Sequence, residues 1–151
     1  MPARVAVDVE VVMEAFAALV ATTPSVQTVT RIWQPWEQLK SINQPAIVIV
    51  EPWENEVADI GRRSKITLTT QLVCYLIVNN ADLTTPPAKQ VNTLIKKIRQ
   101  VLLPSGSDIV NNVNTLGGLA AGVFVNGKIV KDAGVLDEQA SILIPVTIIL
   151  P

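Results

Sequence analysis

The sequence predicts an α+β fold in which two main helices pack against a mostly antiparallel β-sheet. Two segments repeat apolar residues at helical spacing, and six others have the β-branched or alternating composition of strands. Their order along the chain, α-β-β-β-α-β-β-β, favours an α+β arrangement. The chain has 151 residues, which is enough for one domain with a hydrophobic core. We therefore expect residues 1–151 to form a single domain.

The first helix is predicted over residues 8–21, and the sheet and second helix follow in residues 26–151. The apolar face of this helix is formed by residues at helical spacing: Val9, Val12, Met13, Phe16, Leu19 and Val20. Glu10 and Glu14 occupy the other side near its start, where the helix dipole favours negative charge. The helix must end before Pro24, because the residue that precedes a proline avoids helical angles.

Two strands are predicted between this helix and the middle of the chain. Residues 26–33 alternate between β-branched and polar side chains, and residues 46–50 form a short apolar run after a proline. Residues 36–43, which lie between them, are expected to hold a helical turn. Residues 51–61 carry four acidic side chains and no basic one, which predicts an exposed loop.

The longest strand pattern covers residues 64–78. Its first half alternates between polar and apolar residues, whereas the residues after Leu72 are apolar on both sides. We therefore expect that end of the strand to be covered on both faces. The second helix is predicted near residues 86–103, with a stripe of apolar residues and only positive charges: Lys89, Lys96, Lys97 and Arg99.

The last third of the chain predicts a hairpin and a closing strand. Residues 120–132 resemble two strands joined at Asn126-Gly127, a strong short-range hairpin signal. Residues 140–150 form the last strand. Pro145 removes a hydrogen-bond donor from it, so we expect either an edge strand or a bulge.

Composition excludes several classes of function. Apolar residues make up 49% of the chain and charged residues 17%, which excludes a disordered chain. The net charge of −1 disfavours a general nucleic-acid binder. The chain has no histidine, so a Ser-His-Asp triad, a Cys-His pair and histidine-ligated metals are excluded. Its single cysteine, Cys74, permits neither an intrachain disulfide nor a structural zinc site, and we expect it to be buried.

No segment indicates a membrane protein or an exported one. The longest apolar runs have seven residues, and a membrane-spanning helix needs about twenty. Asp8, Glu10 and Glu14 interrupt the stretch that a signal peptide would need. We expect a protein that is soluble and made in a cytoplasm.

Individual motifs do not indicate catalysis, so we predict no catalytic residue, no cofactor and no metal site. The acidic residues of 51–61 can be a calcium site or a solvated loop, and their spacing does not match an EF-hand. The sequence Leu116-Gly117-Gly118 can cradle a phosphate or form a tight turn, and the turn is the better interpretation because no P-loop lysine accompanies it. Trp33 is expected in the core, while Trp53 has no preferred side.

Charge is separated along the chain. Residues 1–60 have three basic and eight acidic residues, whereas residues 61–151 have nine basic and five acidic ones. Such separation favours association with copies of the same chain. The sign changes abruptly in residues 51–65, where Arg62-Arg63-Ser64-Lys65 can contact phosphate or begin a solvated strand. We predict a subunit or tube interface there, formed by Trp53, Glu54, Glu56, Arg62, Arg63 and Lys65.

The order and spacing of several short segments resemble the tail terminator, or tail completion, proteins of long-tailed bacteriophages. The segments that carry the resemblance are Gln44-Pro45-Ala46, Leu72-Val73-Cys74-Tyr75-Leu76-Ile77-Val78, Ile98-Arg99-Gln100-Val101-Leu102, Thr115-Leu116-Gly117-Gly118, Asn126-Gly127-Lys128-Ile129, Asp132-Ala133-Gly134 and Ile144-Pro145-Val146. The resemblance covers roughly residues 30–151, and the N-terminal helix fits by position only.

The resemblance implies a structural role in the virion and no enzymatic activity. Such proteins assemble in the host cytoplasm as a six-membered ring on the head-proximal end of the tail tube. The ring stops polymerisation of the tube and offers a surface for head joining, so the implied partners are copies of the chain, the tail tube protein and the head-closure protein. DNA passes through the ring without sequence-specific binding, and we expect the all-basic helix to face outward or toward a neighbour.

Two other interpretations stay open. The first is another head-tail junction protein, such as a neck or head-closure protein. The second is a peptide-binding α+β module unrelated to phages, which would dock an extended peptide on an edge strand.

Overall fold

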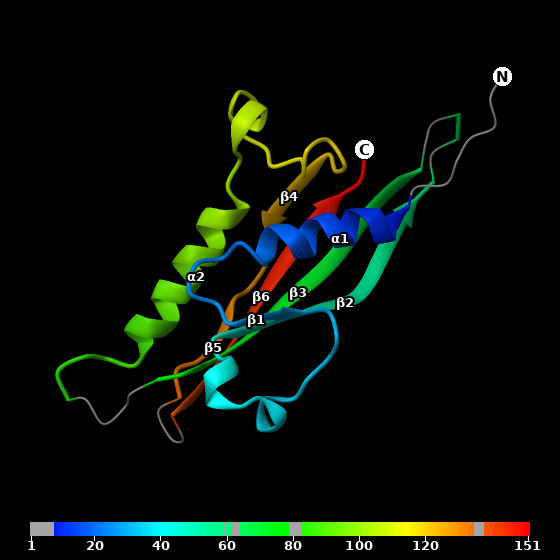
Figure 1. Cartoon of the computed structure of the whole chain (residues 1–151). Coiled ribbons are helices and arrows are strands. Elements are labelled where there is room, and N and C mark those ends of the chain that lie inside the picture. Colours follow the sequence, from blue (N-terminus) through cyan, green and yellow to red (C-terminus); the bar gives the residue numbers. More distant parts are fainter. Residues whose placement is uncertain (1–7, 59, 62–63, 79–82, 135–137) are drawn as a thin grey trace.

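The computed structural model describes residues 8–58, 60–61, 64–78, 83–134 and 138–151. The described residues form two α-helices and six strands in the predicted order, and Figure 1 shows their arrangement. Their bounds are α1 Val9–Val20, β1 Thr28–Thr30, β2 Ala46–Val57, β3 Lys65–Ile77, α2 Ala88–Leu102, β4 Gly122–Val125, β5 Val130–Asp132 and β6 Gln139–Ile149, with short 3₁₀ turns at Trp36–Gln38, Ser41–Asn43 and Gly106–Ile109. The predicted α+β class is therefore confirmed.

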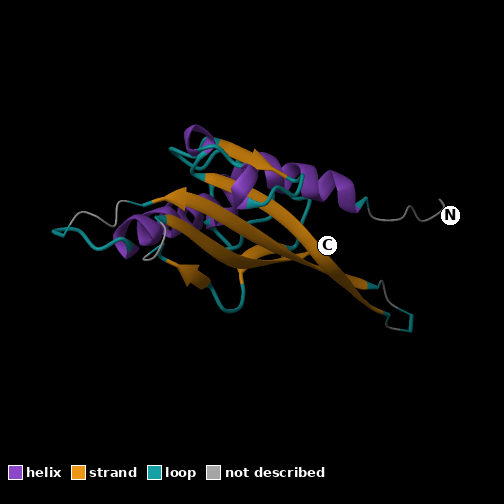
Figure 2. Cartoon of the chain, turned by 90° about the horizontal axis from the view of Figure 1, so that it is seen from below, coloured by secondary structure: helices purple, strands orange, loops and turns teal. Residues whose placement is uncertain are grey.

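All six strands belong to one sheet with the order β1-β2-β3-β6-β4, and β5 also pairs with β6. The pairing is antiparallel except between β1 and β2. β3 is the centre of the sheet, because it pairs with β2 on one side and with β6 on the other over most of its length. Figure 2 shows this sheet as a strongly twisted layer beside the helices.

Both helices begin and end close to their predicted positions. Asp8 caps α1, since its carboxylate accepts hydrogen bonds from the N–H groups of Glu10 at 3.1 Å and Val11 at 3.4 Å. Val91, Ile95 and Ile98 of α2 belong to its buried stripe. Neither helix in the described residues has the length and apolar character of a membrane span.

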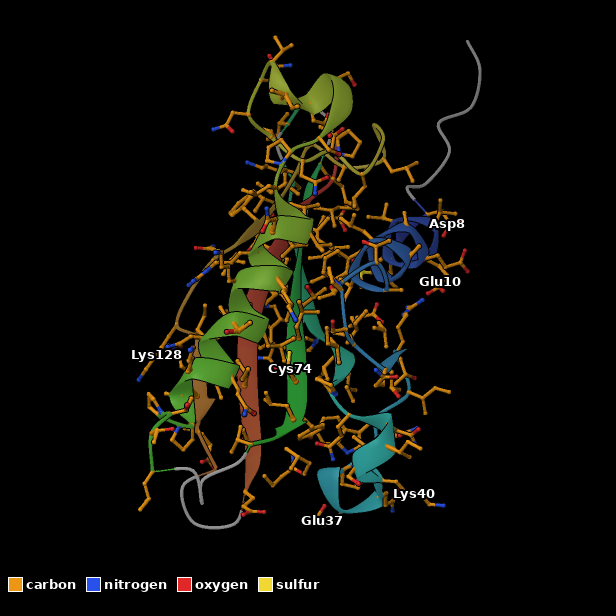
Figure 3. The ribbon with its side chains drawn as sticks, turned by 60° about the vertical axis from the view of Figure 1, so that its left-hand side comes forward. Asp8, Glu10, Glu37, Lys40, Cys74 and Lys128 are labelled. Atoms are coloured by element: carbon orange, nitrogen blue, oxygen red, sulfur yellow. The ribbon has the colours of Figure 1, made fainter. Side chains whose placement is uncertain are left out.

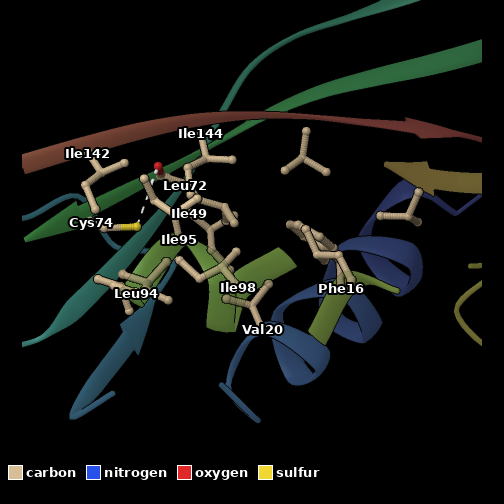
Figure 4. Close-up of a cluster of buried hydrophobic side chains, with 14 of the residues drawn as sticks. Phe16, Val20, Ile49, Leu72, Cys74, Leu94, Ile95, Ile98, Ile142 and Ile144 are labelled. Carbon is tan, nitrogen blue, oxygen red and sulfur yellow. Dashed lines mark hydrogen bonds between the residues drawn. The ribbon is translucent and has the colours of Figure 1, made fainter. Parts of the chain in front are cut away.

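The core lies between the helices and one face of the sheet. Figure 4 shows Phe16 and Val20 of α1 and Ile95 and Ile98 of α2 gathered against the strands. The strand side chains that complete this cluster include Ile49, Leu72, Cys74, Ile142 and Ile144. All of them are buried, so the helical layer and the sheet are joined by a continuous apolar contact.

The second face of the sheet is less covered than we expected. Side chains of β3 alternate between the two faces, and Leu72 and Cys74 point into the core while Val73 is only half-buried on the other face. Its neighbour Leu143 on β6 is half-buried as well. On the same face Tyr75 is buried and Ile77 is exposed, although both helices lie on the core side. The expectation that the apolar end of β3 is covered on both faces therefore holds only in part.

Residues 51–57 form a strand and not the exposed loop that we expected. β2 continues to Val57 and pairs with β3 throughout, but its register shifts between Val50 and Trp53. At this bulge, Glu51 and Pro52 together oppose Thr70, so the alternation of side chains changes phase. The phase change and the proline, which an edge strand tolerates at a bulge, explain why the segment lacks a strand pattern.

The predicted hairpin at Asn126-Gly127 does not form. β4 and β5 do not pair with each other, and both pair with β6, where they lie end to end. Pro145 explains the interruption between them. The Asn126 N–H donates to the Pro145 carbonyl at 3.1 Å, so the missing Pro145 donor faces the same edge. β6 is an interior strand and not an edge strand, because it pairs with β3 on one side and with β4 and β5 on the other. The chain between β4 and β5 bulges away from β6 opposite Pro145.

Gly127 fits this bulge because it has no side chain. Its φ is +125°, and a Cβ there would lie 3.0 Å from Cγ of Pro145. The Asn-Gly sequence therefore serves the passage over Pro145 and not a hairpin turn.

The first predicted strand is shorter than expected, and Trp33 is not in the core. Of residues 26–33 only Thr28–Thr30 form a strand, because β1 pairs with β2 at three positions and the chain then leaves the sheet. The Trp33 side chain is 59% exposed as a result. The helical turn expected in residues 36–43 is present as two 3₁₀ turns.

Replacement of Ile95 by alanine tests the position of the core. Ile95 is 2% exposed, so we expect the free energy of unfolding to fall by about 2–5 kcal/mol. Chemical denaturation followed by circular dichroism measures the loss. The matched control is Ile42→Ala, because Ile42 is 78% exposed and its truncation should change stability by less than about 0.5 kcal/mol. Equal effects of the two variants would contradict the described core.

Candidate interaction surface

The paired ends of β2 and β3 extend beyond the body of the domain. We call residues 52–57 and 65–68 the arm. Figure 1 shows it running past the start of α1, away from the rest of the sheet. Every described residue from 51 to 58 is exposed. β1 does not pair with this part of β2, and only its first residues, Trp53 and Glu54, lie near the start of α1. On the β3 side of the arm, Thr67 and Leu68 also pair with β6, whereas residues 52–57 have no strand partner other than β3 in the described part of the chain.

The structure places four predicted interface residues on the arm. Trp53, Glu54 and Glu56 belong to β2, and Lys65 begins β3. Arg62 and Arg63 lie outside the described residues. The Trp53 side chain is 61% exposed. It therefore lies at the surface, where the sequence had favoured neither the core nor the surface.

The bulge in β2 determines which side chains of the arm share a face. Trp53 is paired with Thr69, and Glu54 is paired with Leu68, a core residue. Successive residues then alternate, so Trp53, Asn55 and Val57 share one face while Glu54 and Glu56 share the other. One face of this strand therefore carries two apolar side chains, Trp53 and Val57, and the other face carries two carboxylates.

The outer edge of the arm also carries backbone hydrogen-bonding groups. β1 pairs with β2 only at residues 46–48, so the outer edge of β2 beyond Val48 has no strand partner among the described residues. An exposed strand edge invites pairing with other chains, and proteins limit this with prolines and charges. Pro52, Glu54 and Glu56 have this effect here.

Arg31 fixes the base of the arm to α1. Its guanidinium donates to both carboxylate oxygens of Glu10, at 2.6 and 2.7 Å, and to Glu51 at 2.8 Å. Glu51 lies in the bulge and Glu10 lies in the first turn of α1. Two hydrogen bonds from Arg31 lower the pKa of Glu10 below its ordinary value. The start of α1 and the base of the arm are therefore held together by one side chain.

A groove lies at the opposite edge of the sheet, between α2 and β4. Its volume is about 480 Å3, and its lining includes Arg99, Leu103, Val113 and Phe124. Leu103, Val113 and Phe124 are all exposed. The sequence analysis did not find this groove, because its walls come from residues far apart in the chain. The only feature of the sequence that pointed to this region was the row of positive charges on α2.

The charge separation along the sequence is largely kept in the folded chain. Acidic side chains concentrate on α1 and β2: Asp8, Glu10, Glu14, Glu51, Glu54 and Glu56. Basic side chains concentrate on α2 and the β4–β5 edge: Lys89, Lys96, Lys97, Arg99, Lys128 and Lys131. Figure 3 shows Lys128 on one side of the molecule and Asp8 and Glu10 on the other. The exceptions are Arg31, Lys40 and Lys65 among the acidic residues and Asp108, Asp132 and Glu138 among the basic ones.

Cys74 has the surroundings of a structural thiol. It is fully buried in the core, and burial raises its pKa to about 12. Its thiol donates to the Leu72 carbonyl at 3.9 Å. A thiol that stays protonated at neutral pH is a poor nucleophile, so Cys74 packs the core as we expected.

The acidic segment and the Gly-Gly segment have local structural roles. Glu51 is bound to Arg31, and Asp59 lies outside the described residues. No group of three or more potential metal ligands occurs in the described part of the chain. Leu116, Gly117 and Gly118 have φ values of +51°, +69° and +93°, and Gly118 N–H donates to the Thr115 carbonyl at 3.0 Å. This geometry is a tight turn.

Comparison with known proteins leaves the function open. No family model matches the chain, and no curated protein matches it. The functional assignment therefore depends on the surfaces described above and on the resemblance seen in the sequence.

Acid should remove the stabilising contribution of the Glu10–Arg31 contact. Because the pKa of Glu10 is lowered in the folded chain, the contribution is fully present above its ordinary value of 4.5 and is lost as the pH falls through the lowered pKa. We expect Glu10→Gln to be less stable than the wild type at neutral pH and equally stable at about pH 2.

Urea denaturation at both pH values measures this difference. Glu56→Gln is the control, because Glu56 lies on the arm away from Arg31 and should leave stability unchanged at both pH values. A Glu10→Gln variant that matches the wild type at neutral pH would contradict the described contact.

Proposed function

We propose that the protein is a tail terminator that forms a ring of identical copies on the head-proximal end of a bacteriophage tail tube. The observation that supports this most strongly is the pair of unlike surfaces on opposite edges of one sheet. The arm is exposed and partly acidic, and the α2–β4 groove is apolar and flanked by basic residues. The resemblance of residues 30–151 to tail terminators supports the same role.

Unlike surfaces on opposite edges favour a ring over a symmetric dimer. A two-fold dimer uses the same patch on both copies, whereas a ring joins one patch to a different patch on the next copy. The separated charges also favour a head-to-tail order, because opposite charges attract across each contact while like edges repel.

Exposed apolar residues support an assembled state. Trp53, Val57 and Ile60 are exposed at the arm end. A second group lies on the segment that follows α2 and on β4: Leu103, Ile109, Val110, Val113, Leu119 and Phe124. Monomeric soluble proteins rarely expose apolar residues in such groups, and larger patches mark interaction surfaces. Both groups fit contacts within an assembly, either between copies or with the tube and the head-closure protein.

The basic residues of α2 fit a surface that faces away from the channel. Lys89, Lys96 and Arg99 are exposed, and Lys97 is half-buried. A channel lined by all four would hold DNA through its phosphates in a salt-dependent way. Passage of DNA is easier if these side chains face a neighbouring copy or the outside of the ring.

A peptide-binding module is the second candidate, and the free outer edge of β2 favours it. An extended peptide adds to such an edge through main-chain hydrogen bonds. This module would be active as a monomer, whereas a terminator acts as a ring. Sedimentation in the presence of tail tubes separates the two, since only a terminator joins the tubes.

The length of tail tubes tests the proposal. Tubes assembled without this protein should grow to widely varying lengths. Tails of the wild-type phage, which contain the protein, should have one length and an extra density at one end. Electron microscopy of tails from a phage that lacks the protein measures this. Tails of normal length without heads would instead identify a head-closure protein and contradict the proposal.

A further inference from the structure

We infer that the arm of one copy docks into the α2–β4 groove of the next copy. This inference rests on the proposed ring and names the contact that would build it. Trp53 and Val57 would lie against the apolar lining of the groove, and Glu54 and Glu56 would face Lys96 and Arg99. The occupant of the groove is therefore a second copy of this chain.

The position of the two surfaces in the sheet supports a contact between copies. Glu54 is in register with Leu68 on β3, Leu68 with Ile148 on β6, and Ile148 with Val123 on β4. The acidic face of the arm and the wall of the groove thus lie at the same level, three strand spacings apart, which is about 14 Å. An arm cannot reach across its own sheet to fill its own groove.

The common level also suits a closed ring. If the strands run along the rotation axis, a neighbour placed by a rotation alone keeps its groove at the level of the first copy's arm. A contact without a shift along the rotation axis closes into a ring, whereas a contact with a shift continues as a helical filament.

The apolar parts of the two surfaces correspond. Trp53 and Val57 are 61% and 57% exposed, and the exposed groove residues Leu103, Val113 and Phe124 are also apolar. A large aromatic side chain that fills an apolar pocket at the centre of an interface contributes a large share of its binding energy. Trp53 is the exposed aromatic side chain of the arm and would fill the groove in this way.

The charged parts of the two surfaces correspond as well. Glu54 and Glu56 share a face of the arm. Lys96 and Arg99 are three positions apart on α2, so they share a helix face. All ion pairs within the described residues involve Arg31, so these four charges are available to a neighbouring copy. The acidic pair and the basic pair have equal and opposite charge.

Charge reversal tests the contact. The arm variant is Glu54→Lys with Glu56→Lys, and the groove variant is Lys96→Glu with Arg99→Glu. Each reversal places like charges at every contact, so each variant alone should need an about tenfold higher concentration than the wild type to assemble. An equal mixture should assemble like the wild type, because its copies can alternate so that every contact joins opposite charges.

Sedimentation velocity measures assembly of the wild type, each variant and the mixture, and circular dichroism shows that each variant is folded. Assembly of either variant alone at wild-type concentration overturns the inference. Failure of the mixture, when both folded variants also fail alone, overturns it too. If the wild type assembles and limits tube length while the variants do so equally well, the ring proposal stands and only this contact is wrong. A wild type that neither self-assembles nor limits tube length overturns both.

Trp53→Ala and Trp33→Ala form a second, charge-independent pair of variants. Both tryptophans are exposed to nearly the same extent, 61% and 59%, so their truncation should not affect folding. We expect Trp53→Ala to weaken assembly and Trp33→Ala to leave it unchanged. Equal assembly of the two variants overturns the inference.

Discussion

The pairing of β3 with both of its neighbours is the constraint on which the core and the arm both depend. β3 spans Lys65–Ile77 and pairs with β2 and with β6. Its inner half lies under the helices, where Leu72 and Cys74 join the core. Its outer half pairs with residues 53–57 of β2 and so forms the arm. Because one continuous strand forms both halves, the rigid core sets the direction in which the arm projects.

The bulge at Glu51 and Pro52 determines which side chains of β2 face each side of the arm. Without the extra residue, the residues of β2 beyond it would keep the alternation that buries Ile47 and Ile49. The phase change instead places Trp53 and Val57 on one face of the arm and two carboxylates on the other, and Arg31 holds the bulge to α1 through Glu51 and Glu10. The charges and the proline discourage indiscriminate pairing at this free edge, while Trp53 is left exposed for a specific contact.

The sequence predicted the elements whose signals are local. Both helices, β3 and β6 have regular periodicity over many residues, and the structure has them where they were expected. Signals that depend on distant partners failed. The Asn126-Gly127 pair predicts a hairpin from local sequence alone. Pro145 of β6 instead interrupts the edge strand at this pair, so that β4 and β5 both pair with β6. Trp33 is apolar, but β1 ends too early to bring it to the core. Trp53, Glu54, Glu56 and Lys65 lie together on the arm because they are neighbours in the chain or across one strand pair, and their role in an interface stays a prediction. The groove was missed because Arg99 and Phe124 line it only in the fold.

Cross-linking between the arm and the groove tests most directly that copies join head to tail. Glu54→Cys and Arg99→Cys would be combined in one chain and treated with a short bismaleimide, and the buried Cys74 does not compete. The account predicts a ladder of covalent multimers that ends at one closed species, while each single variant gives no ladder. Products that end at the dimer, or no cross-links in a protein that assembles, would contradict it.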